Sequence, residues 1–243
     1  MITFKDLGRH GRLGNQMFQY AALKSLSIHK KYTIKIPYCN ITEVFDLKEE
    51  ELGKEDLTMI NSYYTQPYFG FDESFFSLKD GVNIKGYFQS EKYFFPIKSY
   101  IGEVFIFKQK PCSLKEKTVS IHVRRGDYVR KQMYHPLCSM NYYERAMSLF
   151  TDVKFLVFSD DIEWCKQNFK GNQFVFSEGN SEGEDIALMS MCDHNIIANS
   201  SFSWWGAYLN KNKSKKVIVP KNWFGPALGH GPIDLIPKEW III

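Results

Sequence analysis

The chain has 243 residues, of which 44% are hydrophobic and 24% charged, a composition typical of globular proteins with material for one large domain or two small ones. Its formal net charge is +4, and the lysines and arginines are spread along the whole chain instead of forming a basic stripe. These values argue against disorder and against nucleic-acid binding, and they favour a small phosphorylated ligand.

Cysteine usage and the N-terminus both indicate a cytosolic protein. The 5 cysteines are scattered and form no Cys-x-x-Cys pair, which favours reduced thiols. Residues 1–6 contain no apolar signal segment, and no apolar run approaches the ~20 residues of a membrane span. We therefore expect neither a cleaved secretion signal nor an anchoring helix.

A strand-loop-helix unit is predicted at the start of the chain. Ile2 and Phe4 alternate with polar neighbours and lead into three glycines within residues 8–16, with Asn15 as the candidate N-cap of a helix. Such a loop offers backbone N–H groups to an anion. The glycine spacing misses the dinucleotide fingerprint, so a plain tight turn is an equal alternative. The helix would bury one face, made of Phe18, Ala21, Ala22, Ser25 and Leu26.

The pattern weakens after a second predicted strand at residues 32–36. Residues 46–58 are acidic, with leucines at loose helical spacing, which predicts a surface helix with a flanking loop. Aromatic clusters follow, and residues 86–94 combine four aromatic rings with Gln, Ser, Glu and Lys. Such a segment suits either carbohydrate binding or core packing.

The second half alternates strand-like and helical runs. Strands are predicted at residues 118–123, 155–158, 174–176, 195–198 and 216–219, with helices between them. Consecutive β-α steps of this kind predict a parallel, doubly wound sheet. The remaining residues, 223–243, are rich in Pro, Gly and Trp and are predicted to form a capping tail.

The most informative strand is residues 119–123. Its period-2 alternation points His122 and Arg124 the same way, and Gly126 and Asp127 follow in the loop. At the carboxyl end of a strand, where open α/β sheets bind ligands, an arginine fork suits phosphate oxygens. The alternative is a turn whose charges pair with each other in water.

Other predicted strand ends also have polar residues. Ser200 and Ser201 precede a helix and could hold a phosphate or simply cap that helix. Asp193, between a helix and a strand, could accept hydrogen bonds from a purine or cap a turn. The adjacent acids Asp160 and Asp161 point in different directions and lack a third ligand, so a metal site there is the weaker interpretation.

Four stretches together resemble the bacterial α-1,2-fucosyltransferases of glycosyltransferase family 11. They are residues 11–21 (GRLGNQMFQYA), 86–94 (GYFQSEKYF), 122–127 (HVRRGD) and 200–206 (SSFSWWG), in the family's order. The chain departs from the family in being shorter than many members and in having Arg12 where many have Gly.

The resemblance implies an α/β, GT-B-like fold of two Rossmann-like halves with the active site in the cleft between them. We expect an acceptor-side domain at residues 1–110, a donor-binding domain at 111–222 and the tail at 223–243. It further implies an inverting transfer of fucose from GDP-fucose to the 2-hydroxyl of a galactose-terminated glycan in surface polysaccharide biosynthesis, with no cofactor and no obligatory metal. A cytoplasmic location follows, and peripheral contact with the inner membrane surface stays open.

By the same resemblance, Arg124 holds the β-phosphate, His122 and Asp193 contact guanine, Ser200 and Ser201 bind the pyrophosphate, and Asn15 lies beside the reacting centre. Gly14 and Arg125 complete the expected donor-binding set. Gln89, Glu91 and Tyr93 are the expected acceptor-binding residues.

In the implied reaction, a preplaced Arg124 stabilises the negative charge that develops on the departing GDP. Asp127 and Glu91 are both candidates for a carboxylate that assists the acceptor hydroxyl, and the sequence does not choose between them or require a base. Two alternatives remain: a metal-dependent nucleotide phosphohydrolase that uses Asp160 and Asp161, and a non-catalytic sugar-nucleotide-binding module.

Overall fold

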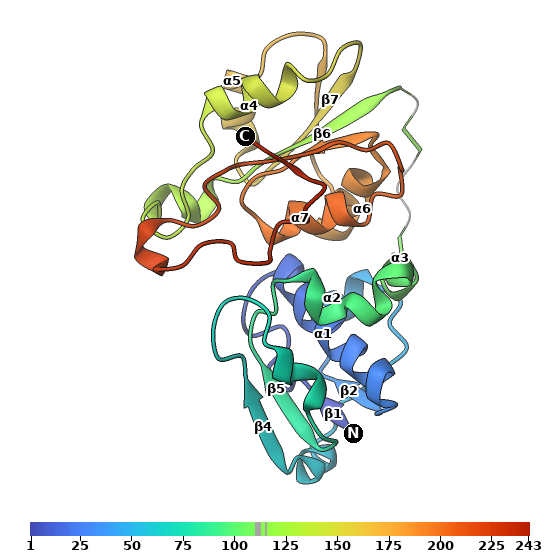
Figure 1. Ribbon diagram of the computed structural model, residues 1–243. Helices are drawn as coiled ribbons and strands as arrows, with labels where there is room; N and C mark the ends of the chain where they lie inside the picture. Colours follow the sequence, from blue (N-terminus) through green and yellow to red (C-terminus); the bar gives the residue numbers. More distant parts are fainter. Residues whose placement is uncertain (110–112, 115) are drawn as a thin grey trace. The chain divides into compact units, whose positions relative to one another are not determined.

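The computed structural model describes residues 1–109, 113–114 and 116–243. The chain forms two compact units (Figure 1). The first unit contains residues 1–108 and 232–237, and the second contains residues 109–231 and 238–243. The predicted domain boundary between residues 110 and 111 lies outside the described residues.

The first unit is built on a parallel sheet of five strands in the order β3-β2-β1-β5-β4. The strands are β1 (Ile2–Thr3), β2 (Ile34–Ile36), β3 (Glu50–Glu51), β4 (Ser62–Thr65) and β5 (Val82–Lys85). The helices are α1 (Leu13–Lys30), α2 (Asn40–Val44) and α3 (Ile101–Val104), with 3₁₀ helices η1 (Glu55–Met59), η2 (Glu73–Ser77) and η3 (Glu91–Tyr100).

Helix α1 is the main core helix of this unit, and every residue of its predicted inner face is buried. One local prediction is wrong and another is only partly met. The helix begins at Leu13 with Arg12 as its N-cap, so Asn15 lies in the first turn and is not the cap. The surface helix predicted within residues 46–58 is shorter than expected: β3 first adds to the sheet beside β2, and only the 3₁₀ helix η1 follows it.

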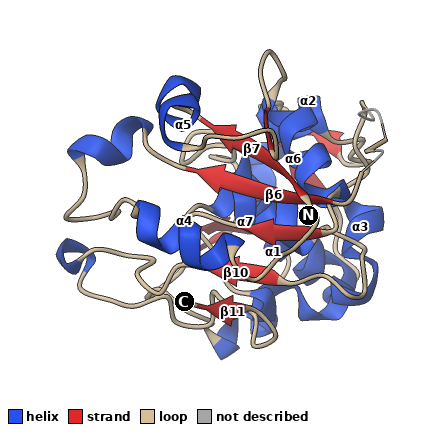
Figure 2. Cartoon of the chain, turned by 90° about the horizontal axis from the view of Figure 1, so that it is seen from above, coloured by secondary structure: helices blue, strands red, loops and turns tan. Residues whose placement is uncertain are grey.

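The second unit is built on a parallel sheet of six strands in the order β11-β10-β9-β6-β7-β8, and Figure 2 labels β7, β6, β10 and β11 of this sheet. The strands are β6 (Thr118–Val123), β7 (Lys154–Ser159), β8 (Phe174–Phe176), β9 (His194–Ile196), β10 (Val217–Val219) and β11 (Ile241–Ile242). The helices are α4 (Met140–Met147), α5 (Ile162–Asn168), α6 (Glu182–Met191) and α7 (Ser201–Tyr208), with 3₁₀ helices η4 (Gly126–Arg130) and η5 (Pro226–Leu228).

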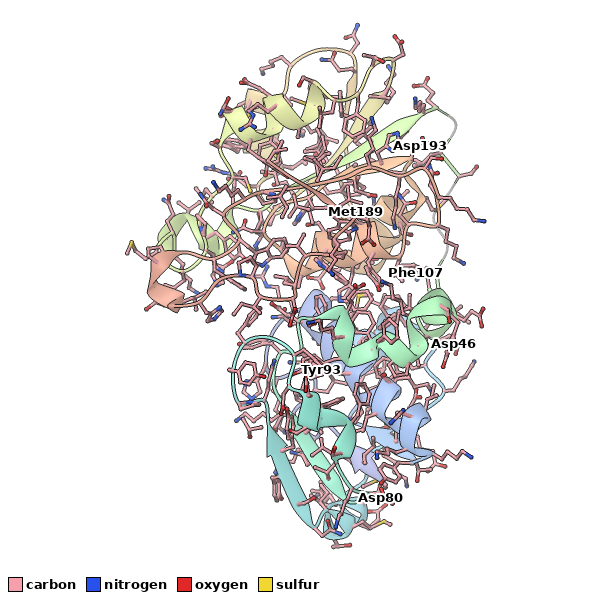
Figure 3. The ribbon with its side chains drawn as sticks, viewed as in Figure 1. Asp46, Asp80, Tyr93, Phe107, Met189 and Asp193 are labelled. Carbon is pink, nitrogen blue, oxygen red and sulfur yellow. The ribbon has the colours of Figure 1, made fainter. Side chains whose placement is uncertain are left out.

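The central strand β6 buries both faces, as parallel strands do. On one face, Val119, Ile121 and Val123 pack in a cluster with residues of α4 and α5. On the other face, Phe158 of β7 packs with Met189 of α6, which Figure 3 labels. The predicted parallel sheet of the second half is therefore confirmed, including its helices on both sides.

The C-terminal tail contributes to both units. Ile241 and Ile242 extend the second sheet as β11, in register with Ile218 and Val219 of β10. Before that, Leu235 is fully buried within the first unit. Throughout the described residues, no helix has the length and apolar character that crossing a bilayer requires.

Candidate active site

Arg124 lies directly after β6, at the carboxyl edge of the second sheet. Its side chain is 13% exposed and is held by two carboxylates: Nη1 pairs with Asp160 Oδ2 at 2.5 Å, and Nη2 pairs with Asp127. The guanidinium carbon also lies 5.0 Å from the centre of the Tyr128 ring. These contacts hold the guanidinium in place before any ligand arrives.

Asp127 stays ionised beside this arginine. Burial acts to raise the pKa of Asp127, but the charge of Arg124 and hydrogen bonds from Lys131 and Arg124 lower it below the usual value. The charges of this turn therefore do pair with one another, as the alternative interpretation of the sequence predicted. The pairing is half-buried, however, and it fixes the arginine at the strand end.

The acids Asp160 and Asp161 bind the arginine pair. Asp160 Oδ1 accepts a hydrogen bond from the backbone N–H of Arg125 at 2.8 Å, and Asp161 Oδ2 accepts one from Arg125 Nε at 2.9 Å. The Arg125 guanidinium also lies 4.2 Å from the Trp164 ring centre. Arg125 thus contacts the start of α5. Among the described residues, no group of three or more His, Cys, Asp or Glu side chains is placed to hold a metal ion.

Gly126 is required by this arrangement. A Cβ atom at this position would overlap Oδ2 of Asp160, the oxygen that pairs with Arg124. The bare backbone therefore lets Asp160 reach across to both arginines. This close approach is the physical reason for a glycine between Arg125 and Asp127.

His122 is buried under α7 and is neutral. Its Nδ1 lies 2.8 Å from Oγ of Ser203, and its backbone carbonyl accepts a hydrogen bond from the Tyr143 hydroxyl at 3.2 Å. Burial, followed by the positive charge of Arg124, lowers the pKa of His122 to about 3. The imidazole is therefore a neutral hydrogen-bonding group at physiological pH.

Replacing His122 with asparagine is expected to reduce the loss of unfolding free energy that the wild type shows between pH 7 and pH 5. The imidazole titrates near 6.5 in the unfolded chain and at about 3 in the folded protein. Between these values the unfolded state binds the extra proton, so the free energy of unfolding should fall by about 2 kcal/mol from pH 7 to pH 5. Urea unfolding at both pH values measures the effect. Parallel profiles for the variant and the wild type would contradict it.

Helix α7 begins at the same edge, and its start is tied to His122. Ser200 is the N-cap residue in an extended conformation, and its side chain makes no capping hydrogen bond. Ser203 Oγ, which contacts His122, also lies 3.4 Å from the Ser200 carbonyl oxygen. The structure therefore brings Ser200 and Ser201 to the strand end that holds His122 and Arg124.

Asp193 does not join this group. Its carboxylate accepts a hydrogen bond from the backbone N–H of Thr118 at 2.8 Å, where β6 begins, and Figure 3 shows its place. Thr118 and His122 are four residues apart on one strand, a separation of about 13 Å. Asp193 precedes β9 and so lies at the amino edge of the sheet, where it caps β6.

Asp185 is an acid at the carboxyl edge that the sequence reasoning missed. It lies in the first turn of α6, and its Oδ1 accepts hydrogen bonds from Ser177 Oγ at 2.6 Å and Asn180 Nδ2 at 3.3 Å. Burial raises the pKa of Asp185, although these hydrogen bonds oppose the shift. The sequence could have indicated this position, because Asp185 lies at the start of the helix that follows β8. A helix that follows a parallel strand begins at the carboxyl edge of the sheet.

In the first unit, Asn15 and Gln89 are in contact. Gln89 Nε2 donates to Asn15 Oδ1 at 2.8 Å across 74 residues of sequence. The glycine loop ends at Gly14, which is buried in the first turn of α1, and Gly11 has a positive φ of 96°. A Cβ at Gly11 would overlap the Asn15 side chain, so this glycine makes room for it.

The other two predicted acceptor residues differ from each other. Glu91 Oε2 pairs with Lys98 Nζ at 2.8 Å and is 23% exposed. Tyr93, labelled in Figure 3, is fully buried, and its hydroxyl donates to the Gly70 carbonyl at 2.9 Å and accepts from the Asp72 N–H at 3.0 Å. A side chain without exposed surface offers nothing to an acceptor, so the structure gives Tyr93 a packing role instead.

Comparison with known proteins identifies the family. The model of the family described as glycosyl transferase family 11 matches residues 3–243. The chain belongs to glycosyl transferase family 11. The transferase is 32% identical to an α-1,2-colitosyltransferase of Escherichia coli, over 96% of each protein, and 26% identical to galactoside α-(1,2)-fucosyltransferase 1 of Rattus norvegicus, over 82% of this chain and 61% of that protein.

Solved structures support the fold of this family 11 transferase. POFUT1 in complex with GDP matches with a TM-score of 0.59 at 11% identity, covering 90% of this chain and 97% of that one. The fucosyltransferase NodZ from Bradyrhizobium matches with a TM-score of 0.51 at 11% identity, covering 84% and 91%. The predicted α/β, GT-B-like fold with two Rossmann-like halves is confirmed by these likenesses and by the two parallel sheets.

Proposed function

We propose that this transferase moves an L-fucose-type sugar from its GDP-activated form to the 2-hydroxyl of a galactose-terminated glycan, with inversion at the sugar carbon. The names of its relatives support a 1,2-linkage, a galactoside acceptor and fucose as the donor sugar. One relative is a colitosyltransferase, and colitose is fucose without its 3-hydroxyl, so GDP-colitose is the second candidate donor. A further relative is named for O-antigen biosynthesis, which supports a bacterial surface glycan as the acceptor.

The observation that carries the proposal is the pre-oriented Arg124. In the transfer, the bond between the sugar carbon and the β-phosphate oxygen breaks, and the electron pair leaves with GDP. A cation already fixed by Asp160 and Asp127 stabilises that charge without rearranging during the reaction. The α7 start, with Ser200 and Ser201, supplies backbone N–H groups and hydroxyls to the same diphosphate.

The remaining donor contacts follow from the edge of the second sheet. His122 presents a neutral imidazole, and Asp185 presents a carboxylate that can accept hydrogen bonds from the N–H groups of guanine. We assign the purine to Asp185 in place of Asp193, which lies at the opposite edge. Arg125, held by Asp161, supports the loop.

The first unit supplies the acceptor side in this proposal. The acceptor hydroxyl attacks the sugar carbon from the face opposite the leaving phosphate and then loses its proton. Asn15, held by Gln89, is the polar group assigned to the reacting centre, and Glu91 or Asp127 is the carboxylate that would take the proton. A cytoplasmic enzyme with peripheral membrane contact is part of the same proposal and rests on the family resemblance.

The test is product formation from defined substrates. The protein is incubated with GDP-fucose or GDP-colitose and with methyl β-galactoside or lactose, with and without EDTA, and products are read by mass and linkage. We expect one GDP released per 1,2-linked product, at a rate that EDTA leaves unchanged because Asp160 and Asp161 are committed to arginines. Chelator-sensitive release of phosphate without acceptor would favour the phosphohydrolase, and GDP binding without turnover would favour the binding module.

A further inference from the structure

Tyr87 is a half-exposed aromatic ring at the carboxyl edge of the first sheet. It follows β5 by two residues, and 50% of its surface is exposed. Because β5 and β1 are parallel neighbours, the loop after β5 and the glycine loop after β1 lie at one edge. Gln19 joins the two loops, since its Nε2 donates to the carbonyls of both His10 and Gly86.

The backbone around Tyr87 is rigid. The N–H groups of Tyr87 and Phe88 both donate to Oε1 of Gln66 at 3.0 Å. Phe88 has a positive φ of 52°, which non-glycine residues rarely adopt, and its ring is fully buried. A Cβ at Gly86 would overlap the Gln66 side chain. The buried Phe88 ring thus fixes a strained turn that leaves the neighbouring Tyr87 ring outside.

The strained backbone at Phe88 does not bury the Tyr87 ring, which stays half-exposed. Residues held in sparsely populated backbone regions gather at functional sites, where the surrounding fold imposes them. Phe88 is anchored by several rings, including Phe75 at 5.4 Å and Tyr93 at 5.0 Å between ring centroids. Because the core of the first unit fixes Phe88, the neighbouring Tyr87 ring is held in an exposed position.

Gln66 also connects this turn to the loop at Gly70, next to which two more exposed apolar side chains lie. Gln66 Nε2 donates to the Gly70 carbonyl at 2.9 Å. A Cβ at Gly70 would lie 3.6 Å from Tyr68 Cε2 and 3.4 Å from Ile233 Cγ2, and these two side chains are 56% and 53% exposed. We name Tyr68, Tyr87 and Ile233 the tyrosine platform.

We propose that the tyrosine platform binds the acceptor, with the Tyr87 ring stacked on the apolar face of the galactose ring whose 2-hydroxyl reacts. This inference rests on the proposed function and adds the residue that holds the acceptor. A sugar ring has one face of C–H groups and an edge of hydroxyls, so it needs an exposed aromatic plane beside hydrogen-bonding groups. Tyr87 supplies the aromatic plane. Gln89, two positions later in the sequence, supplies amide groups together with its partner Asn15.

The experiment compares steady-state kinetics of Tyr87→Ala with the wild type, using methyl β-galactoside and GDP-fucose as probes. We expect the acceptor KM to rise about ten-fold, while the donor KM, the Kd for GDP and the slow hydrolysis of GDP-fucose without acceptor stay unchanged. Tyr87→Phe and Tyr87→Trp keep the ring and should keep the acceptor KM within about two-fold. Tyr87→Leu keeps apolar bulk without an aromatic face and should resemble the alanine variant.

Tyr63→Ala is the matched control, because Tyr63 is 68% exposed on β4 of the same unit and its ring centre lies 5.1 Å from the Lys5 ammonium. It should leave every constant unchanged. An unchanged acceptor KM in both Tyr87→Ala and Tyr87→Leu would overturn the platform while leaving the transferase assignment intact. An absence of transfer by the wild-type protein with either GDP-sugar would instead overturn the proposed function.

Discussion

Replacing Arg124 with alanine is expected to lower kcat/KM for sugar transfer about a thousand-fold, the range found when a preorganised transition-state donor is removed. Arg124 sits between Asp160 and Asp127, and the variant would leave both acids facing the departing diphosphate. The variant loses the attraction between Arg124 and the diphosphate, and it gains repulsion between the diphosphate and the two acids. Both changes lower the rate of transfer. Arg124→Lys should recover only part of the loss, because an ammonium group cannot meet two partners in the plane of a guanidinium fork.

The matched control is Arg130→Ala, because Arg130 is an exposed arginine of the same 3₁₀ helix η4. It should transfer at the wild-type rate. Far-UV circular dichroism and the urea midpoint check that Arg124→Ala is folded. A folded Arg124→Ala variant that transfers within ten-fold of the wild type would remove Arg124 from the catalytic assignment.

Replacing Asp160 with alanine is expected to lower kcat/KM about a hundred-fold, although Asp160 is given no contact with substrate. Its two oxygens bind different groups: Oδ2 pairs with Arg124 Nη1 at 2.5 Å, and Oδ1 accepts from the Arg125 N–H at 2.8 Å. Without them the guanidinium loses its orientation, and a small misplacement of a catalytic group can cost about that factor. Asp160 is thus a positioning residue, and the loss should fall on kcat more than on the donor KM.

Two further variants separate orientation from charge. Asp160→Asn keeps an oxygen for the Arg125 N–H but loses the ion pair, so it should fall between the wild type and alanine. Glu163→Ala is the control, because Glu163 is 73% exposed and pairs only with Lys166 among the described ion pairs. If Asp160 merely competed with the diphosphate for Arg124, the alanine variant would bind GDP more tightly and turn over at least as fast. That result would contradict the positioning role.

The elements of the second unit could be predicted because they are patterned locally. Strand β6 has the predicted bounds, residues 118–123, and β8 also has the predicted bounds, residues 174–176. β6 was predicted from its alternating pattern and the glycine that follows it, and β8 from a short apolar run that ends at Ser177. β6 is buried on both faces, whereas β8 lies at the edge of the sheet and is only partly buried. Trp204 and Trp205, in α7, are both fully buried.

The first unit was harder to predict because its elements are short and depend on distant partners. β3 consists of two glutamates and exists only because β2 lies beside it. Tyr93 and Tyr87 lie in one aromatic segment, yet one is fully buried and the other half-exposed. No pattern within residues 86–94 separates them, because a positive φ at Phe88 turns the chain between them.

By itself, the sequence determined the two-unit α/β fold, the family and the residues that follow β6, because strand alternation and short motifs are local properties of the chain. Only the tertiary structure decided which of those residues meet. It joined Arg124 to Asp160 and Asn15 to Gln89, and it put Asp193 at the amino edge and Asp185 at the carboxyl edge. The physical reason is that side-chain partners 36 or more residues apart are chosen by strand direction and core packing, and no local pattern encodes either choice.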